Sequence, residues 1–176
     1  MTLYRLSKVA LLTALLSVSA YLLPPFQVPV VGIAFTLQTA VIVLIGFLLK
    51  PTDAFLCVIT YLVLGLIGLP IFSNKVGGIA PFVGPTAGFL YLFPVVAFLI
   101  ALLKSKTKNI FYDILVATLV SIVLVYPLST IYFSIYTKMS YMDALLYFTP
   151  YMVVDFIKII LAYVLYRKIP EEIAYL

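Results

Sequence analysis

Histidine is absent from this chain, and cysteine occurs once, as Cys57. The missing histidine removes the commonest general base and the commonest metal ligand among the side chains. Cys57 cannot form an internal disulfide, and its apolar neighbours predict that it packs as a small hydrophobic residue. Serine–histidine proteolysis and zinc chemistry therefore lack their usual residues, so we expect no catalytic residues, no metal site and no cofactor.

Charged residues are also scarce. Only 10% of the 176 residues are charged and 65% are hydrophobic, whereas soluble domains carry about 25% charged residues. A soluble protein of this composition would lack a polar surface, so we expect lipid as its solvent. The sequence contains no glycine-rich phosphate-binding loop, and we expect no ATP hydrolysis by this chain. Its length favours a single integral membrane domain, residues 1–176.

The hydrophobic runs predict an all-α membrane protein with six transmembrane helices, because a helix needs about 17–25 mostly apolar residues to cross a bilayer. The expected spans are Leu6–Leu23, Phe35–Leu49, Ala54–Ile67, Gly84–Leu103, Ile110–Tyr136 and Leu145–Tyr166. The first run is similar to a signal peptide, but Pro24 and Pro25 follow it in place of a cleavage site, so we expect a retained span. Pro127 predicts a kink or a tilt in the fifth span.

The basic residues predict the orientation of these helices, because cytoplasmic loops of membrane proteins are enriched in lysine and arginine. Eight of them fall on one side of a six-span arrangement: Arg5, Lys8, Lys50, Lys104, Lys106, Lys108, Arg167 and Lys168. Only Lys75 and Lys138 fall on the other side. We therefore expect both termini in the cytoplasm and no nucleic-acid partner. The run from Lys104 to Lys108 is either a topology anchor or a site for lipid headgroups.

Two opposite charges, Asp155 and Lys158, interrupt the last span. Residues three apart on a helix share one face, and charges within a membrane usually face protein or water. Pro150 predicts the outer end of this helix nearby, which would place the pair one or two turns inside the membrane. The pair is either a structural ion pair or a site for a ligand of complementary polarity. The charge-poor outer side, with its glycine- and proline-rich loop Gly68–Thr86, favours a mouth for a small molecule.

Three segments of the sequence resemble the BioY family, the biotin-specific substrate-binding (S) components of energy-coupling factor (ECF) transporters. They are Phe35–Thr39, the stretch Gly68–Leu90 with Gly77-Gly78 and Gly84-Pro85-Thr86, and the stretch from Pro150 through Asp155 and Lys158 to Ala162. The resemblance implies a six-helix S-component bundle in the plasma membrane of a prokaryote. It also implies high-affinity biotin binding from the outside and release to the cytoplasm by reorientation of the protein within the membrane. The implied partners are a coupling transmembrane subunit and two ABC-type ATPases, so this chain would be no enzyme.

The same resemblance implies a set of ligand-binding residues. The ureido ring of biotin has two N–H donors and one carbonyl acceptor, so we expect Asp155 to accept from an N–H and Lys158 to donate to a ligand oxygen. Asn74 either contacts the ureido group through its amide or is a turn residue. Lys75 either pairs with the valerate carboxylate or is simply solvated. The other expected contacts are Gly77, Gly78, Thr86, Phe89 and Tyr151.

Small residues four apart on the first span, Ala10 and Ala14, allow close helix–helix approach in lipid. They either pack within the bundle or form the surface that meets the coupling subunit, as the resemblance implies. Two alternatives stay open for the whole protein. It is an S component for another vitamin, such as thiamine or riboflavin, or it is a membrane scaffold or orphan enzyme with a purely structural charge pair.

Overall fold

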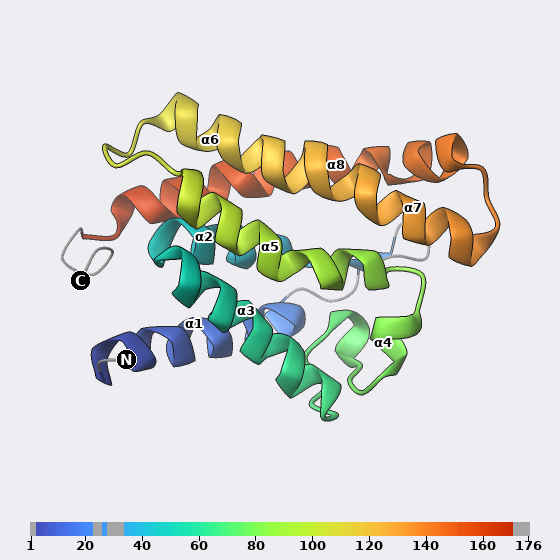
Figure 1. Cartoon of the computed structure of the whole chain (residues 1–176), viewed down its shortest axis with the longest axis horizontal. Coiled ribbons are helices and arrows are strands. Elements are labelled where there is room, and N and C mark those ends of the chain that lie inside the picture. The colour runs from blue at the N-terminus through green and yellow to red at the C-terminus, as the bar shows by residue number, and fades with distance from the viewer. Residues whose placement is uncertain (1–2, 23–25, 28–33, 171–176) are drawn as a thin grey trace.

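The computed structural model describes residues 3–22, 26–27 and 34–170 as an elongated bundle of helices (Figure 1). Its helices are α1 (Leu3–Leu22), α2 (Gln38–Leu48), α3 (Pro51–Leu66), α4 (Ala80–Val83), α5 (Ala87–Leu103), α6 (Ile110–Thr118), α7 (Val125–Thr137) and α8 (Tyr141–Lys168). A 3₁₀ turn, η1 (Ser73–Lys75), precedes α4, and a π-helical segment, η2 (Leu119–Leu124), joins α6 to α7. The strands β1 (Phe26–Gln27) and β2 (Ala34–Phe35) form a short antiparallel pair.

The expected helical architecture is confirmed. Each expected span overlaps a helix or a continuous helical rod of the described chain, whereas the number of membrane crossings stays a prediction. The continuous rod Ile110–Thr137 and helix α8 are each 28 residues long and apolar enough to cross a membrane. Helices α2, α3 and α5 are shorter, with 11, 16 and 17 residues. Their shortness has a local reason, because Pro51 begins α3 directly after α2 ends, and the segment Gly84–Thr86 lies outside α5.

Helix α2 lies at the centre of the bundle and packs against both α5 and α8, while α3 packs against α5 and α1. Most side chains of α2 are buried, as expected of a helix that is apolar all round. Gly46 allows the close approach to α5, because a Cβ at this position would lie 2.8 Å from the side chain of Ile100. Cys57 is fully buried between α3 and α1, which confirms its predicted role as a small packing residue.

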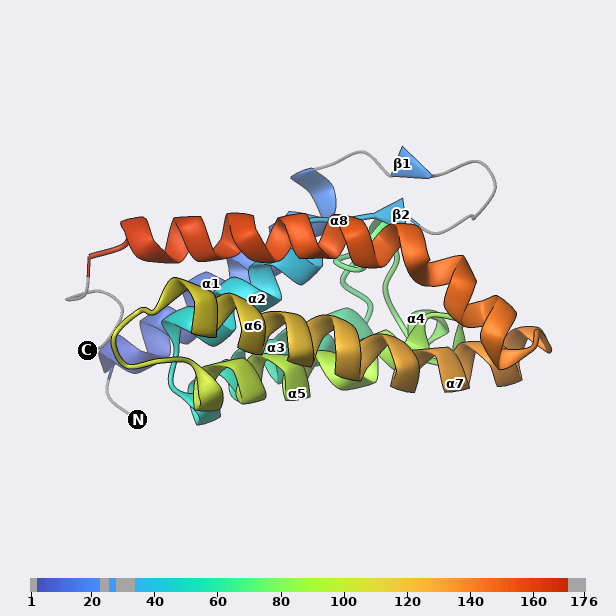
Figure 2. The same ribbon diagram turned by 90° about the horizontal axis from the view of Figure 1, so that it is seen from above.

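One end of the bundle collects the beginning of α1, the turn between α2 and α3, the loop between α5 and α6, and the end of α8 (Figures 1 and 2). Polar contacts tie these segments together. Arg5 on α1 binds the carboxylate of the buried Asp53 on α3 through two hydrogen bonds of 2.6 and 3.0 Å. The ammonium of Lys104 donates to the carbonyls of Phe47 and Leu49, and so satisfies the C-terminal end of α2.

Prolines mark the irregular points of the two longest rods. A π-helical turn, Leu119–Leu124, lies just before Pro127 and leaves the usual i−4 bonding pattern; the kink or tilt expected at Pro127 stays a prediction. Pro150 lies inside α8, whose N-terminal part bends away from the rest of the helix (Figure 2). The sixth helix begins at Tyr141, four residues before the expected start of the span at Leu145.

Candidate functional site

A cavity of about 410 Å³ opens between the η1–α4 region and helices α2, α5, α7 and α8. This volume lies within the range of roughly 300–1,000 Å³ that is typical of small-molecule sites. Its polar wall consists of Thr36, Gln38, Thr39, Ser73, Asn74, Thr86, Tyr126, Tyr151, Asp155 and Lys158. Its apolar wall includes Phe72, Pro81, Phe89, Leu90, Phe93 and Phe148. The segments that form the cavity come from opposite parts of the chain and meet only in the folded bundle.

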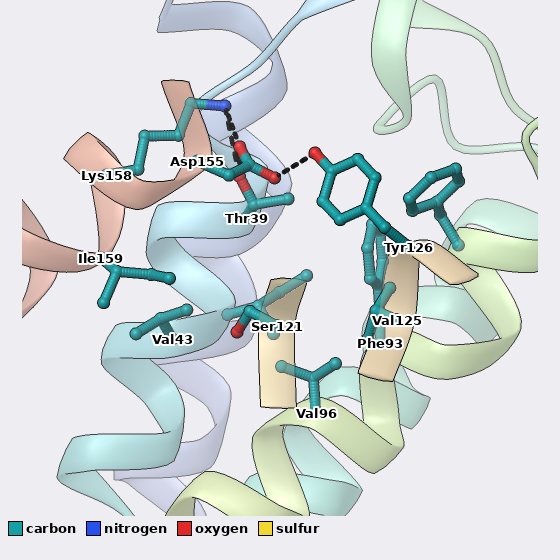
Figure 3. A pocket seen from close by; sticks show the side chains of 12 residues that line it. Thr39, Val43, Phe93, Val96, Ser121, Val125, Tyr126, Asp155, Lys158 and Ile159 are labelled. Carbon is teal, nitrogen blue, oxygen red and sulfur yellow. Dashed lines mark hydrogen bonds and ion pairs between the residues drawn. The ribbon is translucent and has the colours of Figure 1, made fainter. Parts of the chain in front are cut away.

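Asp155 is held by three side chains at the wall of this cavity (Figure 3). Lys158 Nζ lies 2.8 Å from Asp155 Oδ1, and the hydroxyl of Thr39 donates to the same oxygen across 2.9 Å. Tyr126 donates its phenolic hydrogen to Asp155 Oδ2 across 2.8 Å. Lys158 also donates to Thr39 Oγ1 across 3.2 Å. The network thus joins α2, α7 and α8 through one carboxylate.

The two charges are nearly removed from solvent, since the side chains of Asp155 and Lys158 are each 11% exposed. Such burial is tolerated because the charges neutralise each other and because further hydrogen bonds satisfy them. A carboxylate can accept about four hydrogen bonds and an ammonium can donate three. The described partners use only part of this capacity, so both groups retain room to bind a polar ligand in the cavity.

Helix α8 extends well beyond the charge pair in both directions. Because α8 begins at Tyr141 and ends at Lys168, Asp155 is near the middle of the helix. Asp155 comes 14 positions after Tyr141, which corresponds to about 21 Å along the helix at 1.5 Å per residue.

Aromatic rings form the apolar side of the cavity. Phe89 on α5 packs edge-to-face against Tyr126 and Phe148, with centroids 5.2 and 5.1 Å apart. Phe148 in turn packs against Tyr151, with centroids 6.3 Å apart. This geometry is the favourable one for aromatic pairs, and it presents ring faces and edges to a flat apolar ligand.

The segment around η1 brings Asn74 to the mouth of the cavity. Asn74 and Lys75 both adopt left-handed backbone conformations, with φ of 61° and 57°. A buried chain of hydrogen bonds supports the segment, because Gln38 donates to the Tyr61 hydroxyl, which donates to the carbonyl of Ile71. The turn that the sequence offered as an alternative for Asn74 is present, and the amide lines the cavity as well.

The other predicted ligand residues divide into two groups. Thr86, Phe89 and Tyr151 line the cavity together with Asn74, Asp155 and Lys158. Lys75 is exposed on η1, and neither it nor Gly77 or Gly78 contributes to the described wall. Gly77 instead packs against backbone, since a Cβ at this position would contact the carbonyls of Gly68 and Leu69. Gly78 has φ of 81° and donates to the Gly65 carbonyl across 2.7 Å.

Two residues at the charge pair escaped the sequence analysis as site residues. Thr39 lies in the polar start of α2, and Tyr126 lies in the middle of an apolar rod beside a proline. A tyrosine at that depth, far from the interfacial positions where tyrosine is common, is the signal that could have identified it.

No group of three or more metal-binding side chains occurs among residues 3–22, 26–27 and 34–170. The cavity wall offers hydrogen-bond donors, acceptors and aromatic surface to a ligand. Ala10 and Ala14, predicted for partner docking, are both exposed on α1.

Comparisons with known proteins agree on one family. The model of the BioY family matches residues 1–175. The biotin transporter BioY2 of Lactococcus lactis subsp. cremoris is 34% identical over 160 residues, which cover 90% of this chain and 86% of that protein. The biotin transporter BioY of Thermotoga maritima is 33% identical over 158 residues, 90% of each chain. The crystal structure of an S-component for biotin from an ECF-type ABC transporter superposes with a TM-score of 0.86 at 26% identity, covering 96% of this chain and 93% of that one.

Proposed function

The chain belongs to the BioY family, and on this premise we propose that it is the biotin-binding S component of an ECF-type transporter. It is a multi-pass protein of a prokaryotic plasma membrane. One observation carries the proposal: a neutral but polar pair, Asp155 and Lys158, lines a cavity of about 410 Å³ whose other walls are largely aromatic and aliphatic. A ligand with a urea-like polar head and an apolar body fits such a cavity, with its head at the charge pair and its body against the apolar walls.

In the proposed complex, Asp155 accepts from a ureido N–H and Lys158 donates to the ureido carbonyl. Asn74 contacts the ligand from the η1 side of the cavity, while Phe89 and Tyr151 pack against the bicyclic ring. The valerate chain points to the mouth. Thr86, at the start of α5, and the exposed Lys75 on η1 are the donors that we assign to its carboxylate, and Gly77 and Gly78 shape the loop that carries Lys75.

The proposed orientation follows from the distribution of charge in the fold. The end of the bundle that carries the start of α1 and the end of α8 also carries the loops with most of the basic residues (Figure 1). We assign this end to the cytoplasm. The η1–α4 region, which borders the cavity, is near the opposite end and would face the outside (Figure 1).

Release to the cytoplasm then requires energy from other subunits, since the sequence contains no phosphate-binding loop. We assign this energy to a coupling transmembrane subunit and two ABC-type ATPases. The exposed Ala10 and Ala14 on α1 provide a surface of small side chains on which a partner helix can approach closely.

Binding to the purified, detergent-solubilised protein tests the proposal. Biotin, thiamine and riboflavin are titrated separately by calorimetry, with dethiobiotin as the close analogue that keeps the ureido ring and lacks the thioether. We expect biotin to bind at micromolar or lower concentration, dethiobiotin to bind more weakly, and the two other vitamins not to bind. Binding of thiamine or riboflavin in place of biotin would contradict the assigned substrate.

A further inference from the structure

A second, much smaller cavity shares Thr39, Tyr126 and the charge pair with the large one and extends from them toward Ser121. Its volume is about 20 Å³, and a single water molecule requires about 10–15 Å³ of such space. We call it the rear chamber. Its apolar lining includes Ile42, Val43, Val96, Val125 and Ile159, and its polar lining consists of Thr39, Ser121, Tyr126, Asp155 and Lys158. Figure 3 shows Ser121 on the side of this space opposite Asp155 and Lys158.

Three buried hydroxyls of the rod Ile110–Thr137 have no hydrogen-bond partner in the described structure, those of Thr118, Ser121 and Ser129, and of these Ser121 alone lines the small cavity. Thr60, Thr130 and Thr137 each donate to the carbonyl four residues earlier, at 2.8, 2.7 and 2.7 Å. Ser121 lies within the π-helical turn η2, and its Oγ is buried without a hydrogen-bond partner in the described structure. A buried hydroxyl that makes no hydrogen bond costs about 1–3 kcal/mol. The hydroxyl borders a space large enough for one water molecule, which can accept or donate the missing hydrogen bond.

We propose that the rear chamber binds one water molecule, held by Ser121 and by the inner side of the charge pair. The chamber offers the water enough polar groups, because buried waters make about two to four hydrogen bonds. Lys158 Nζ has three hydrogens, and the described residues accept two of them, through Asp155 and Thr39. The water accepts the third hydrogen and donates to the Ser121 hydroxyl. When the ligand binds, its ureido carbonyl accepts the hydrogen that Lys158 directs at Thr39 in the longer of its two bonds, 3.2 Å.

This water has a role in ligand binding, an inference that rests on the proposed function. It satisfies the charge pair from behind, so that Lys158 and Asp155 stay oriented toward the cavity mouth when a ureido group arrives. The hydroxyl of Ser121 is thereby a positioning group, and it acts on the ligand through the water and the pair.

Three variants test the proposal. Ser121→Ala removes the hydroxyl. Val96→Ile adds a methyl group to the lining of the chamber from α5 and leaves Ser121 intact. Ser129→Ala is the matched control, because Ser129 Oγ is also buried without a described partner on the same rod but lines neither cavity. We expect Ser121→Ala and Val96→Ile each to raise the Kd for biotin about three- to tenfold, the effect of one lost hydrogen bond. Ser129→Ala should bind biotin like the wild type.

Crystal structures at a resolution that shows ordered waters provide the second readout. The wild type should show density for a water within hydrogen-bond distance of Ser121 Oγ and Lys158 Nζ, and the two chamber variants should lack it. A dry chamber in the wild type, or wild-type affinity in both chamber variants, would overturn the proposal. If Ser121→Ala does not fold, Val96→Ile decides alone. Failure of the wild type to bind biotin would contradict the proposed function, whereas the density would still decide whether the chamber holds water.

Discussion

Tyr126 and Asp155 are joined by a hydrogen bond of 2.8 Å between the phenol and Oδ2, across 29 positions of the sequence. The bond links α7 to α8 inside the cavity wall and orients the carboxylate that we assign to the ureido group. It gives the buried phenol of Tyr126 a charged hydrogen-bond partner.

Replacement of Tyr126 by phenylalanine keeps the ring and its edge-to-face contact with Phe89 but removes the donor. We expect the Kd for biotin to rise about tenfold, because hydrogen bonds to charged groups contribute about 1.5–3 kcal/mol and part of this is recovered by solvent or ligand. Calorimetric titration measures the change. Tyr132→Phe on the same helix is the control, since Tyr132 lies outside the cavity wall; equal affinities for the two variants would contradict the role of the phenol.

Asn74 offers a test that separates its turn conformation from its amide. Its φ of 61° favours glycine or asparagine. Asn74→Gly therefore preserves the backbone and removes the amide, whereas Asn74→Ala removes the amide and strains the backbone. We expect Asn74→Gly to bind biotin at least fivefold more weakly, roughly 1 kcal/mol, while its thermal stability stays close to that of the wild type. Unchanged affinity in this variant would leave Asn74 as a turn residue only.

Gly77 is expected to act through packing. A Cβ at this position would contact the backbone carbonyls of Gly68 and Leu69, which cannot move independently of the loop. We expect Gly77→Ala to lower the melting temperature by several degrees, in line with a cost of about 1–3 kcal/mol for overpacking. Thermal unfolding in detergent without ligand measures this effect. A stable variant with lost affinity would instead indicate that Gly77 contacts the ligand.

Lys104, in the loop after α5, predicts a dependence of stability on pH. Burial lowers the pKa of its ammonium from 10.5 to about 8. Between pH 8 and 10.5 the unfolded chain therefore binds more protons at this position than the folded chain, and stability should rise with pH across this window. Lys104→Met lacks the group, so the wild type should gain stability relative to this variant from pH 7.5 to pH 10. A constant difference between the two melting temperatures would contradict the prediction.

The sequence predicted the helical rods well because apolar runs of membrane proteins are long and little else can be stable in lipid. It placed the start of the last span at Leu145, four residues after α8 begins, and it did not predict the bend of α8 near Pro150 (Figure 2). Helix-internal prolines are tolerated when neighbouring segments compensate for the missing hydrogen bond, and a sequence does not show those neighbours.

The charge pair was identifiable because ionisable residues are rare in apolar spans and usually functional. Its partners were not identifiable in the same way. Thr39 and Tyr126 reach Asp155 only because α2 and α7 both pack against α8. The unpartnered hydroxyl of Ser121 depends on a π-helical turn, and helix propensity does not distinguish this turn from an α-helical one.

The most direct test of the account compares Asp155→Asn and Lys158→Met with the wild type in one experiment, biotin titration followed by thermal unfolding with and without biotin. A ligand role predicts that each variant loses biotin affinity by at least a hundredfold and that biotin no longer raises its melting temperature. The loss of unfolding free energy without biotin should be smaller than the loss of binding free energy. Wild-type affinity in either variant, accompanied by a large loss of unliganded stability, would show that the pair only holds the bundle together.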